Sequence, residues 1–125
     1  MRVTPIYFTS DPERMRRFCE VLGLSTYLRA DRGGWVEMRG SGGFVGLHEA
    51  TAERAGQSGL GFETDEPLED LRDRLVAAGF DDAHIIDEAW GRVLWVDDPD
   101  GHGLWVQEAR TDLYGYHLVD GQTGA

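Results

Sequence analysis

Four histidines and a surplus of carboxylates are the residues of this 125-residue chain that could do chemistry. His and carboxylate side chains bind divalent metals, and either can act as a general base. No two of the histidines have the His-x-x-x-His spacing of a helical metal site. His48 alternates with Phe44 and Gly46 on a candidate strand, so we expect it to face a cleft and contact a ligand. We expect the others in solvent, in a turn and in the tail: His84, His102 and His117, respectively.

Aromatic side chains are the second group of residues that could bind a ligand, and the chain contains four tryptophans. Each Trp buries about 200 Å², so packing in the core or in a dimer is one explanation. The other is a roomy cleft with flat walls for a planar ligand, in which Glu37 or Glu63 pairs with a cationic group. Glu63 could instead act as a general base. The expected ligand-binding residues are Thr4, Ile6, Phe8, Trp35, Glu37, Phe44, His48, Glu63, Trp95, Trp105 and Gln107, with Trp90 as a further candidate.

The elements that must position these residues form an internal repeat. In the first half, a strand at residues 4–10 precedes Asp11-Pro12, which caps and starts a helix that Gly23 ends. In the second half, a strand at 59–64 precedes a helix that ends at Gly79. The apolar helix positions are Met15, Phe18, Cys19 and Leu22 in the first half, and Leu68, Leu71, Leu75 and Ala78 in the second. The remaining strands are expected at 25–30, 34–39 and 43–49, and at 83–88, 92–96 and 103–108.

The order βαβββ therefore occurs twice, and one such unit cannot bury both its helix and its sheet faces alone. We expect a single α+β domain over residues 1–125, whose two modules pair within one chain or swap between subunits. The expected divisions are module one at about 2–50, a polar linker at about 51–57, module two at about 58–108, and a C-terminal tail at 109–125, which is ordered near Tyr114, Tyr116 and His117.

A hairpin turn closes the second module at Asp98-Pro99-Asp100-Gly101. Pro presets φ, Asp bonds back to its own backbone, and Gly takes the positive φ that follows. Two βαβββ modules with this turn before the last strand resemble the vicinal oxygen chelate superfamily, which includes glyoxalase I, extradiol dioxygenases and bleomycin-resistance proteins. The resemblance covers about residues 2–108. It implies curved mixed sheets around a cleft, usually within a homodimer.

Enzymes of this superfamily hold a metal with His or carboxylate ligands on the first and last strands of each module. The matching positions here are Thr4, Gly46, Gly59 and Trp105, with Leu47 replacing Gly46 if the register shifts. These side chains cannot assemble a divalent metal site, so we expect no metal and no cofactor.

The chain therefore resembles the metal-free, antibiotic-sequestering branch, which implies a protein that binds a hydrophobic or aromatic small molecule. A cationic group on that molecule would suit the acidic chain. Two alternatives stay open. One is a metal-dependent lyase, isomerase or dioxygenase with an atypical site. The other is an interaction module whose cleft is filled by side chains such as Trp105.

Composition and charge limit the partners and the cellular location that we expect. A net charge of −11 argues against nucleic acid as a partner, because phosphate binding needs a basic patch. The acidity serves solubility or attracts a cationic ligand. No apolar run approaches the roughly 20 residues of a membrane span, and the first residues enter a strand without a signal peptide. One cysteine, Cys19, permits no intrachain disulfide and indicates a buried thiol in a cytoplasmic protein.

Overall fold

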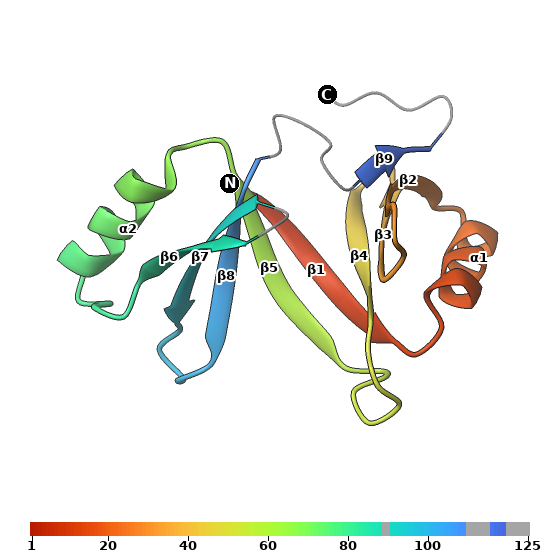
Figure 1. Cartoon of the computed structure of the whole chain (residues 1–125), viewed down its shortest axis with the longest axis horizontal. Coiled ribbons are helices and arrows are strands. Elements are labelled where there is room, and N and C mark those ends of the chain that lie inside the picture. The colour runs from red at the N-terminus through yellow and green to blue at the C-terminus, as the bar shows by residue number, and fades with distance from the viewer. Residues whose placement is uncertain (89–90, 110–115, 120–125) are drawn as a thin grey trace. The chain divides into compact units, whose positions relative to one another are not determined.

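The computed structural model describes residues 1–88, 91–109 and 116–119 (Figure 1). Helices and strands follow each other as two βαβββ modules, so the predicted α+β class is confirmed. The chain divides into two compact units, which we describe separately. The N-terminal unit contains Thr4–Gly59 and the end of the chain from Leu113, and the C-terminal unit contains Met1–Val3 and Leu60–Asp112.

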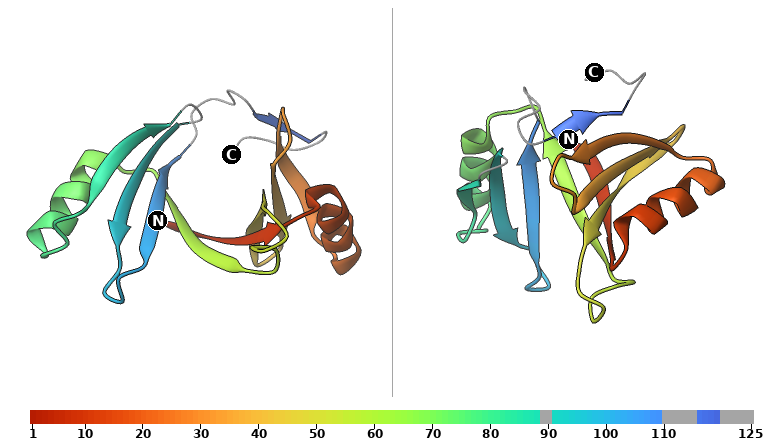
Figure 2. Two further views of the ribbon diagram at one scale, coloured as in Figure 1. Left: turned by 60° about the horizontal axis from the view of Figure 1, so that its bottom comes forward. Right: turned by 45° about the vertical axis from the view of Figure 1, so that its right-hand side comes forward.

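The N-terminal unit is a sheet with one helix on one of its faces (Figure 2). Its strands lie in the order β1-β4-β3-β2-β9, with β1 and β4 parallel and the other pairs antiparallel. Cys19 of the helix packs on Val36, Met38 and Leu47 of the sheet. The elements are β1 (Arg2–Thr9), α1 (Pro12–Leu22), β2 (Ser25–Ala30), β3 (Trp35–Gly40), β4 (Gly43–Glu49) and β9 (Tyr116–Leu118).

The C-terminal unit repeats this plan in the order β6-β7-β8-β5, with β5 and β8 parallel. Leu68 and Leu71 of its helix pack on Leu94 and Val106 of the sheet. Figure 1 shows this helix, α2, beside β6 and β7. The elements are β5 (Ser58–Thr64), α2 (Leu68–Ala77), β6 (His84–Glu88), β7 (Gly91–Asp97) and β8 (Gly103–Glu108).

The repeat extends to individual hydrogen bonds at the end of each unit's first strand. The Thr9 hydroxyl accepts the amide of Asp11 at 3.1 Å, and the Thr64 hydroxyl accepts the amide of Glu66 at 3.2 Å. The carbonyl of each threonine also accepts an amide from the residue that follows the fourth strand of its βαβββ module, in both modules at 2.9 Å. Thr9 and Thr64 are therefore equivalent positions, and the predicted repeat is confirmed.

The first helix has the predicted ends but a narrower buried face. The Asp11 side chain accepts the amide of Arg14, and Gly23 takes a φ of 109° in the left-handed cap. Cys19 is buried, whereas Phe18 is 55% and Leu22 64% exposed. Only part of the predicted apolar face is therefore covered by the sheet.

The second helix begins one residue later than its proline suggests. Pro67 is the N-cap and makes no side-chain capping bond. Leu68 and Leu71 are buried and Leu75 packs beside them, as predicted. Ala78 is exposed at the C-cap, so its predicted place on the buried face is wrong; the helix has ended before that position reaches the sheet.

The hairpin turn has the predicted mechanism. The Asp98 carboxylate accepts the amides of Asp100 and His102, each at 2.9 Å. Gly101 takes a φ of +82°, a conformation that L side chains rarely adopt. His102 is exposed in this turn, as expected.

The described part of the tail pairs with the N-terminal unit. Leu118 of β9 lies opposite Leu28 of β2, and His117 Nδ1 is 2.8 Å from the carboxylate of Asp31. Tyr114 lies outside the described residues. No helix in the described part of the chain is long and apolar enough to cross a membrane.

Candidate functional site

Each unit has one sheet face that its helix does not cover, and the predicted site residues lie on these two faces. Strand alternation and register define the face of the N-terminal unit, here called the N-terminal face. The register places Phe8 and Trp35 opposite His48, Glu37 opposite Gly46, and Arg39 opposite Phe44. The N-terminal face comprises Thr4, Ile6, Phe8, Tyr27, Leu28, Trp35, Glu37, Arg39, Phe44, Gly46 and His48.

The indole of Trp35 lies over Gly46 on this face. A Cβ atom at position 46 would be 2.1 Å from Cη2 of the indole. The ring of His48 meets Trp35 edge-on with 6.1 Å between centroids, and it lies 5.5 Å from Phe8. Gly46 is therefore required for this aromatic cluster, since any side chain there would displace the indole.

The residues of this face differ in how far they are exposed to solvent. Ile6 is 3% and Phe8 7% exposed, so a ligand has little access to these two predicted contacts. His48 is exposed, whereas Thr4, Trp35 and Phe44 are half-buried. Trp35, His48 and Phe44 are consequently the aromatic groups of this face that a ligand can reach.

The indole nitrogen of Trp35 is the unsatisfied donor of this cluster. Its Nε1 atom is buried and has no hydrogen-bond partner among the described residues. A buried donor without an acceptor costs about 1–3 kcal/mol. An acceptor on a ligand can reach this nitrogen only if the indole or the atoms that cover it move.

His48 has a defined tautomer. Its Nδ1 lies 2.6 Å from the carbonyl oxygen of Glu49. A carbonyl only accepts, so Nδ1 carries the proton and Nε2 is the acceptor of the neutral ring. The neutral ring can thus accept a hydrogen bond from a ligand at Nε2.

Glu37 is engaged by an arginine of its own strand. Arg39 donates from Nε at 3.2 Å and from Nη2 at 3.1 Å to the same Glu37 oxygen. The guanidinium carbon lies 3.4 Å above the Tyr27 ring and 5.5 Å from the Phe44 ring. Glu37 was predicted to pair with a cationic group of the ligand, but in the structure its carboxylate pairs with Arg39.

The face of the C-terminal unit not covered by α2, here called the C-terminal face, carries the other predicted residues. Trp95 and Trp105 lie opposite each other on β7 and β8, with ring centroids 5.4 Å apart and planes at 48°. Glu63 and Gln107 are paired in the next position of the register. All four are half-buried. The C-terminal face comprises Glu63, Val93, Trp95, Trp105 and Gln107.

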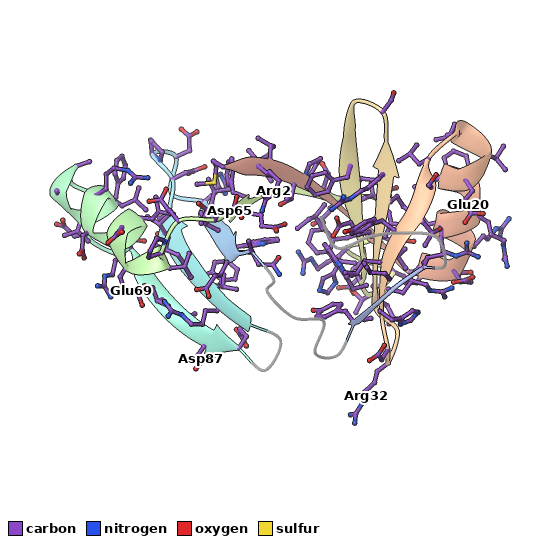
Figure 3. All side chains as sticks on the ribbon, turned by 90° about the horizontal axis from the view of Figure 1, so that it is seen from above. Arg2, Glu20, Arg32, Asp65, Glu69 and Asp87 are labelled. Carbon is purple, nitrogen blue, oxygen red and sulfur yellow. The ribbon has the colours of Figure 1, made fainter. Side chains whose placement is uncertain are left out.

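Arg2 pairs with two acidic groups beside this face. Its Nη2 lies 2.9 Å from Glu63 and its Nη1 3.1 Å from Asp65. Figure 3 shows Arg2 and Asp65 side by side. The hydrogen bond from Arg2 lowers the pKa of Asp65 below its ordinary range. Glu63, like Glu37, therefore already has a cationic partner within the chain.

The structure thus brings the predicted residues together as two aromatic clusters, one in each unit. Seven belong to the N-terminal face and four to the C-terminal face. Trp90 lies outside the described residues. Three further residues were not predicted as site residues: Tyr27, Arg39 and Arg54. Arg54 covers the Phe8 ring at 4.0 Å. The alternation of Arg39 with Trp35 and Glu37 was the available signal for its side of the sheet.

The residues present do not fit the metal site that the resemblance implied for enzymes. The indole of Trp35 fills the space over Gly46, and a Cβ at Gly59 would contact Phe8 at 3.6 Å. No cluster of three or more His, Cys, Asp or Glu side chains that could hold a metal occurs in the described ranges. Thr4 and Trp105 add no suitable ligand set.

A groove of about 390 Å³ at the start of α1 was not predicted. Its charged lining residues are Asp11, Glu13, Arg29 and Glu49. Asp11 caps the helix, and Glu13 accepts hydrogen bonds from Arg16 and, at 2.6 Å, from Arg29. The bond from Arg16 lowers the pKa of Glu13. Glu13 and Arg29 therefore join α1 to β2.

No protein family model matches the sequence, and no curated protein matches it significantly. Solved structures do match. A glyoxalase/bleomycin resistance protein/dioxygenase superfamily member from Vibrio splendidus 12B01 is 21% identical, with a TM-score of 0.60 over 86% of this chain and 97% of that chain. An uncharacterized protein from Methanosarcina mazei is 19% identical, with a TM-score of 0.59 over 91% and 97%.

A third structure, described as an NAD-dependent benzaldehyde dehydrogenase from Legionella pneumophila, is 16% identical. Its TM-score is 0.57 over 85% of this chain and 97% of that chain. Identities this low establish only a shared fold, and one fold supports different activities in different proteins. The function must therefore be argued from the two faces.

Proposed function

We propose that this chain, which has the fold of the glyoxalase/bleomycin resistance/dioxygenase superfamily, is a small-molecule-binding protein. It holds a flat, hydrophobic or aromatic compound against its N-terminal face and protects by sequestering that compound. Binding needs neither a metal nor a cofactor, and the compound leaves chemically unchanged.

The observation that carries the proposal is the arrangement of Trp35 over Gly46. A glycine in mid-strand lets a large indole lie against the sheet, beside the exposed ring of His48 and the half-buried ring of Phe44. Ile6 and Phe8 are buried on the neighbouring strand β1, beside Gly46 and His48. Flat accessible rings on a packed support are what stacking on a planar ligand requires.

The compound needs no positive charge. Glu37 and Glu63 were the carboxylates expected to attract a cation, and each accepts a hydrogen bond from an arginine of this chain. A cationic ligand would have to displace Arg39 or Arg2. Stacking and hydrogen bonding to unsatisfied groups therefore support the proposal better than charge attraction to glutamate.

A homodimer in the cytoplasm belongs to the same proposal. Phe18, Val21 and Leu22 expose apolar surface along α1, with Val21 88% exposed. The resemblance implies a homodimer, and we propose that a second copy of the chain covers this surface. Light scattering coupled to size-exclusion chromatography measures the subunit number, and a monomer at all concentrations contradicts this part.

The proposal is tested with a thermal-shift panel of two- and three-ring aromatic compounds and aromatic antibiotics, using protein treated with chelator. Stabilisation by at least one compound, with quantitative recovery of that compound after incubation, is expected. A panel without binders contradicts the proposed function. Conversion of the compound, or binding that appears after a transition metal is added, instead identifies an enzyme.

A further inference from the structure

We propose that the compound bound at the N-terminal face is an aromatic anion, and that Arg39 anchors its negative group. This inference rests on the proposed function and specifies the chemical class of the ligand. It reverses the expectation drawn from the acidity of the whole chain, because the local charges of this face differ from the net charge of −11.

The guanidinium of Arg39 is held in position by other side chains of the N-terminal face. Two of its nitrogens are fixed on Glu37, and its side chain remains 39% exposed. Its Nη1 group has no hydrogen-bond partner among residues 1–88, 91–109 and 116–119. Tyr27 and Phe44 hold the guanidinium by cation–π contact, at 3.4 and 5.5 Å from the ring centroids. The arginine is therefore oriented before any ligand arrives, so little side-chain entropy is lost on binding.

The unsatisfied groups of this face are donors. Arg39 offers Nη1 to a ligand, while Glu37 is already bonded to Arg39. The indole N–H of Trp35 also has no acceptor among the described residues, but it is buried. Arg54 adds a second positive charge above Phe8. The complementary ligand must supply acceptors and negative charge. A carboxylate on a flat ring system meets both demands.

The C-terminal face provides a contrast within the same chain. Arg2 uses both terminal nitrogens on Glu63 and Asp65, so two carboxylates surround one guanidinium. An anion beside Trp95 and Trp105 would approach this surplus of negative charge. The N-terminal face is therefore the one whose charges favour an anionic ligand.

The distance between Trp35 and Arg39 along β3 also indicates the size of the ligand. Trp35 and Arg39 lie on the same side of β3, four residues and about 13 Å apart along the strand. Phe44 lies opposite Arg39, and His48 opposite Trp35. A ligand of two or three fused rings can stack near Phe44 and extend toward Trp35 while its carboxylate reaches Arg39.

The test uses three probes with one ring system: 2-naphthoate, 2-naphthamide and 2-naphthylmethylammonium. Their affinities are measured by calorimetry at constant ionic strength. We expect 2-naphthoate to bind at least tenfold more tightly than either of the others. Equal binding of all three overturns the inference and leaves the proposed function intact. No binding by any of them, together with an empty aromatic panel, overturns both.

The role of Arg39 is tested with Glu37→Gln/Arg39→Gln, which removes both charges and preserves the net charge. Arg39→Lys provides a second variant that keeps the buried carboxylate paired. Both are expected to lose most of the preference for naphthoate over naphthamide, with circular dichroism confirming a folded chain. Retention of the full preference in either folded variant overturns the assignment to Arg39.

Arg32→Gln is the control for nonspecific charge. Arg32 is exposed in the turn between β2 and β3, and Figure 3 shows its side chain directed away from the sheet. This variant is expected to keep the tenfold preference for the carboxylate. An equal loss in Arg32→Gln means that overall charge governs binding and overturns the role of Arg39.

Discussion

The indole of Trp35 covers Gly46 so closely that a Cβ at position 46 would lie 2.1, 2.6 and 2.9 Å from three of its ring carbons. Real side chains do not tolerate such distances, so the two residues are compatible in this arrangement only because one of them is glycine. The pair connects an unusual strand glycine with the largest accessible ring of the proposed site.

Gly46→Ala is expected to displace Trp35 and to destabilise the chain by about 1–3 kcal/mol, the usual cost of overpacking. Urea unfolding measures the loss, and the tryptophan emission spectrum reports the movement of the ring. Gly59→Ala is the matched control, since its Cβ would meet Phe8 at an ordinary 3.6 Å. Equal stability of Gly46→Ala and wild type contradicts the close contact.

The Trp95–Trp105 pair predicts an optical signal. Rings 5.4 Å apart and inclined at 48° couple their electronic transitions and should give a paired positive and negative band in circular dichroism. Trp95→Phe and Trp105→Phe should each abolish this couplet. Trp35→Phe should retain it. A couplet that survives loss of Trp95 shows that the two rings are not the coupled pair.

Cys19 should be chemically inert while the chain is folded. The residue is 4% exposed, and burial raises the pKa of its thiol. A raised folded-state pKa stabilises the fold below the unfolded pKa, and this contribution is lost as the pH rises through the folded value. Labelling with a thiol-specific disulfide reagent at neutral pH should therefore require urea. Rapid stoichiometric labelling without urea contradicts the burial.

Arg2 and Asp65 predict a contribution to acid sensitivity. The pKa of Asp65 is lowered, so its pairing stabilises the chain above the unfolded pKa and ceases as the pH falls through the folded value. Arg2→Gln should flatten the decline in the urea midpoint between about pH 5 and pH 2. The effect should be small and salt-sensitive, because Asp65 is exposed.

Arg32→Gln removes the same charge from an exposed turn and serves as the control for the Arg2 variant. It should leave the acid profile close to that of the wild type. Identical flattening in both variants shows that net charge, and not the pairing of Arg2 with Asp65, sets the profile.

Sequence patterns were sufficient for the element order because local chemistry fixes it. Asp11 and Gly23 end the first helix through their own backbone bonds, and the turn at Asp98 closes through its carboxylate. Helix faces were less certain. Phe18 fits the apolar periodicity of α1, yet the sheet covers only the stripe around Cys19. Periodicity shows which side is apolar, and the width of the sheet decides how much is buried.

The partners of charged residues could not be predicted, because they depend on register between strands and on distant segments. Arg2 reaches Glu63 across 61 positions. Arg39 lies two residues from Glu37 on the same strand, so strand alternation was a signal for that pair. Because both glutamates have arginine partners, we propose an anionic ligand in place of the expected cationic one. The pairing of β9 with β2 likewise depends on a segment for which the sequence named no partner.

The central claim is tested most directly by the indole N–H signal of Trp35 in a ¹⁵N-labelled protein, assigned with Trp35→Phe. The chain is titrated with the tightest binder of the aromatic panel. The account predicts a saturable shift of this signal that exceeds those of the other three tryptophans, because the ligand stacks at Trp35. Saturable binding that leaves the Trp35 signal unmoved, or a panel without any binder, contradicts the account.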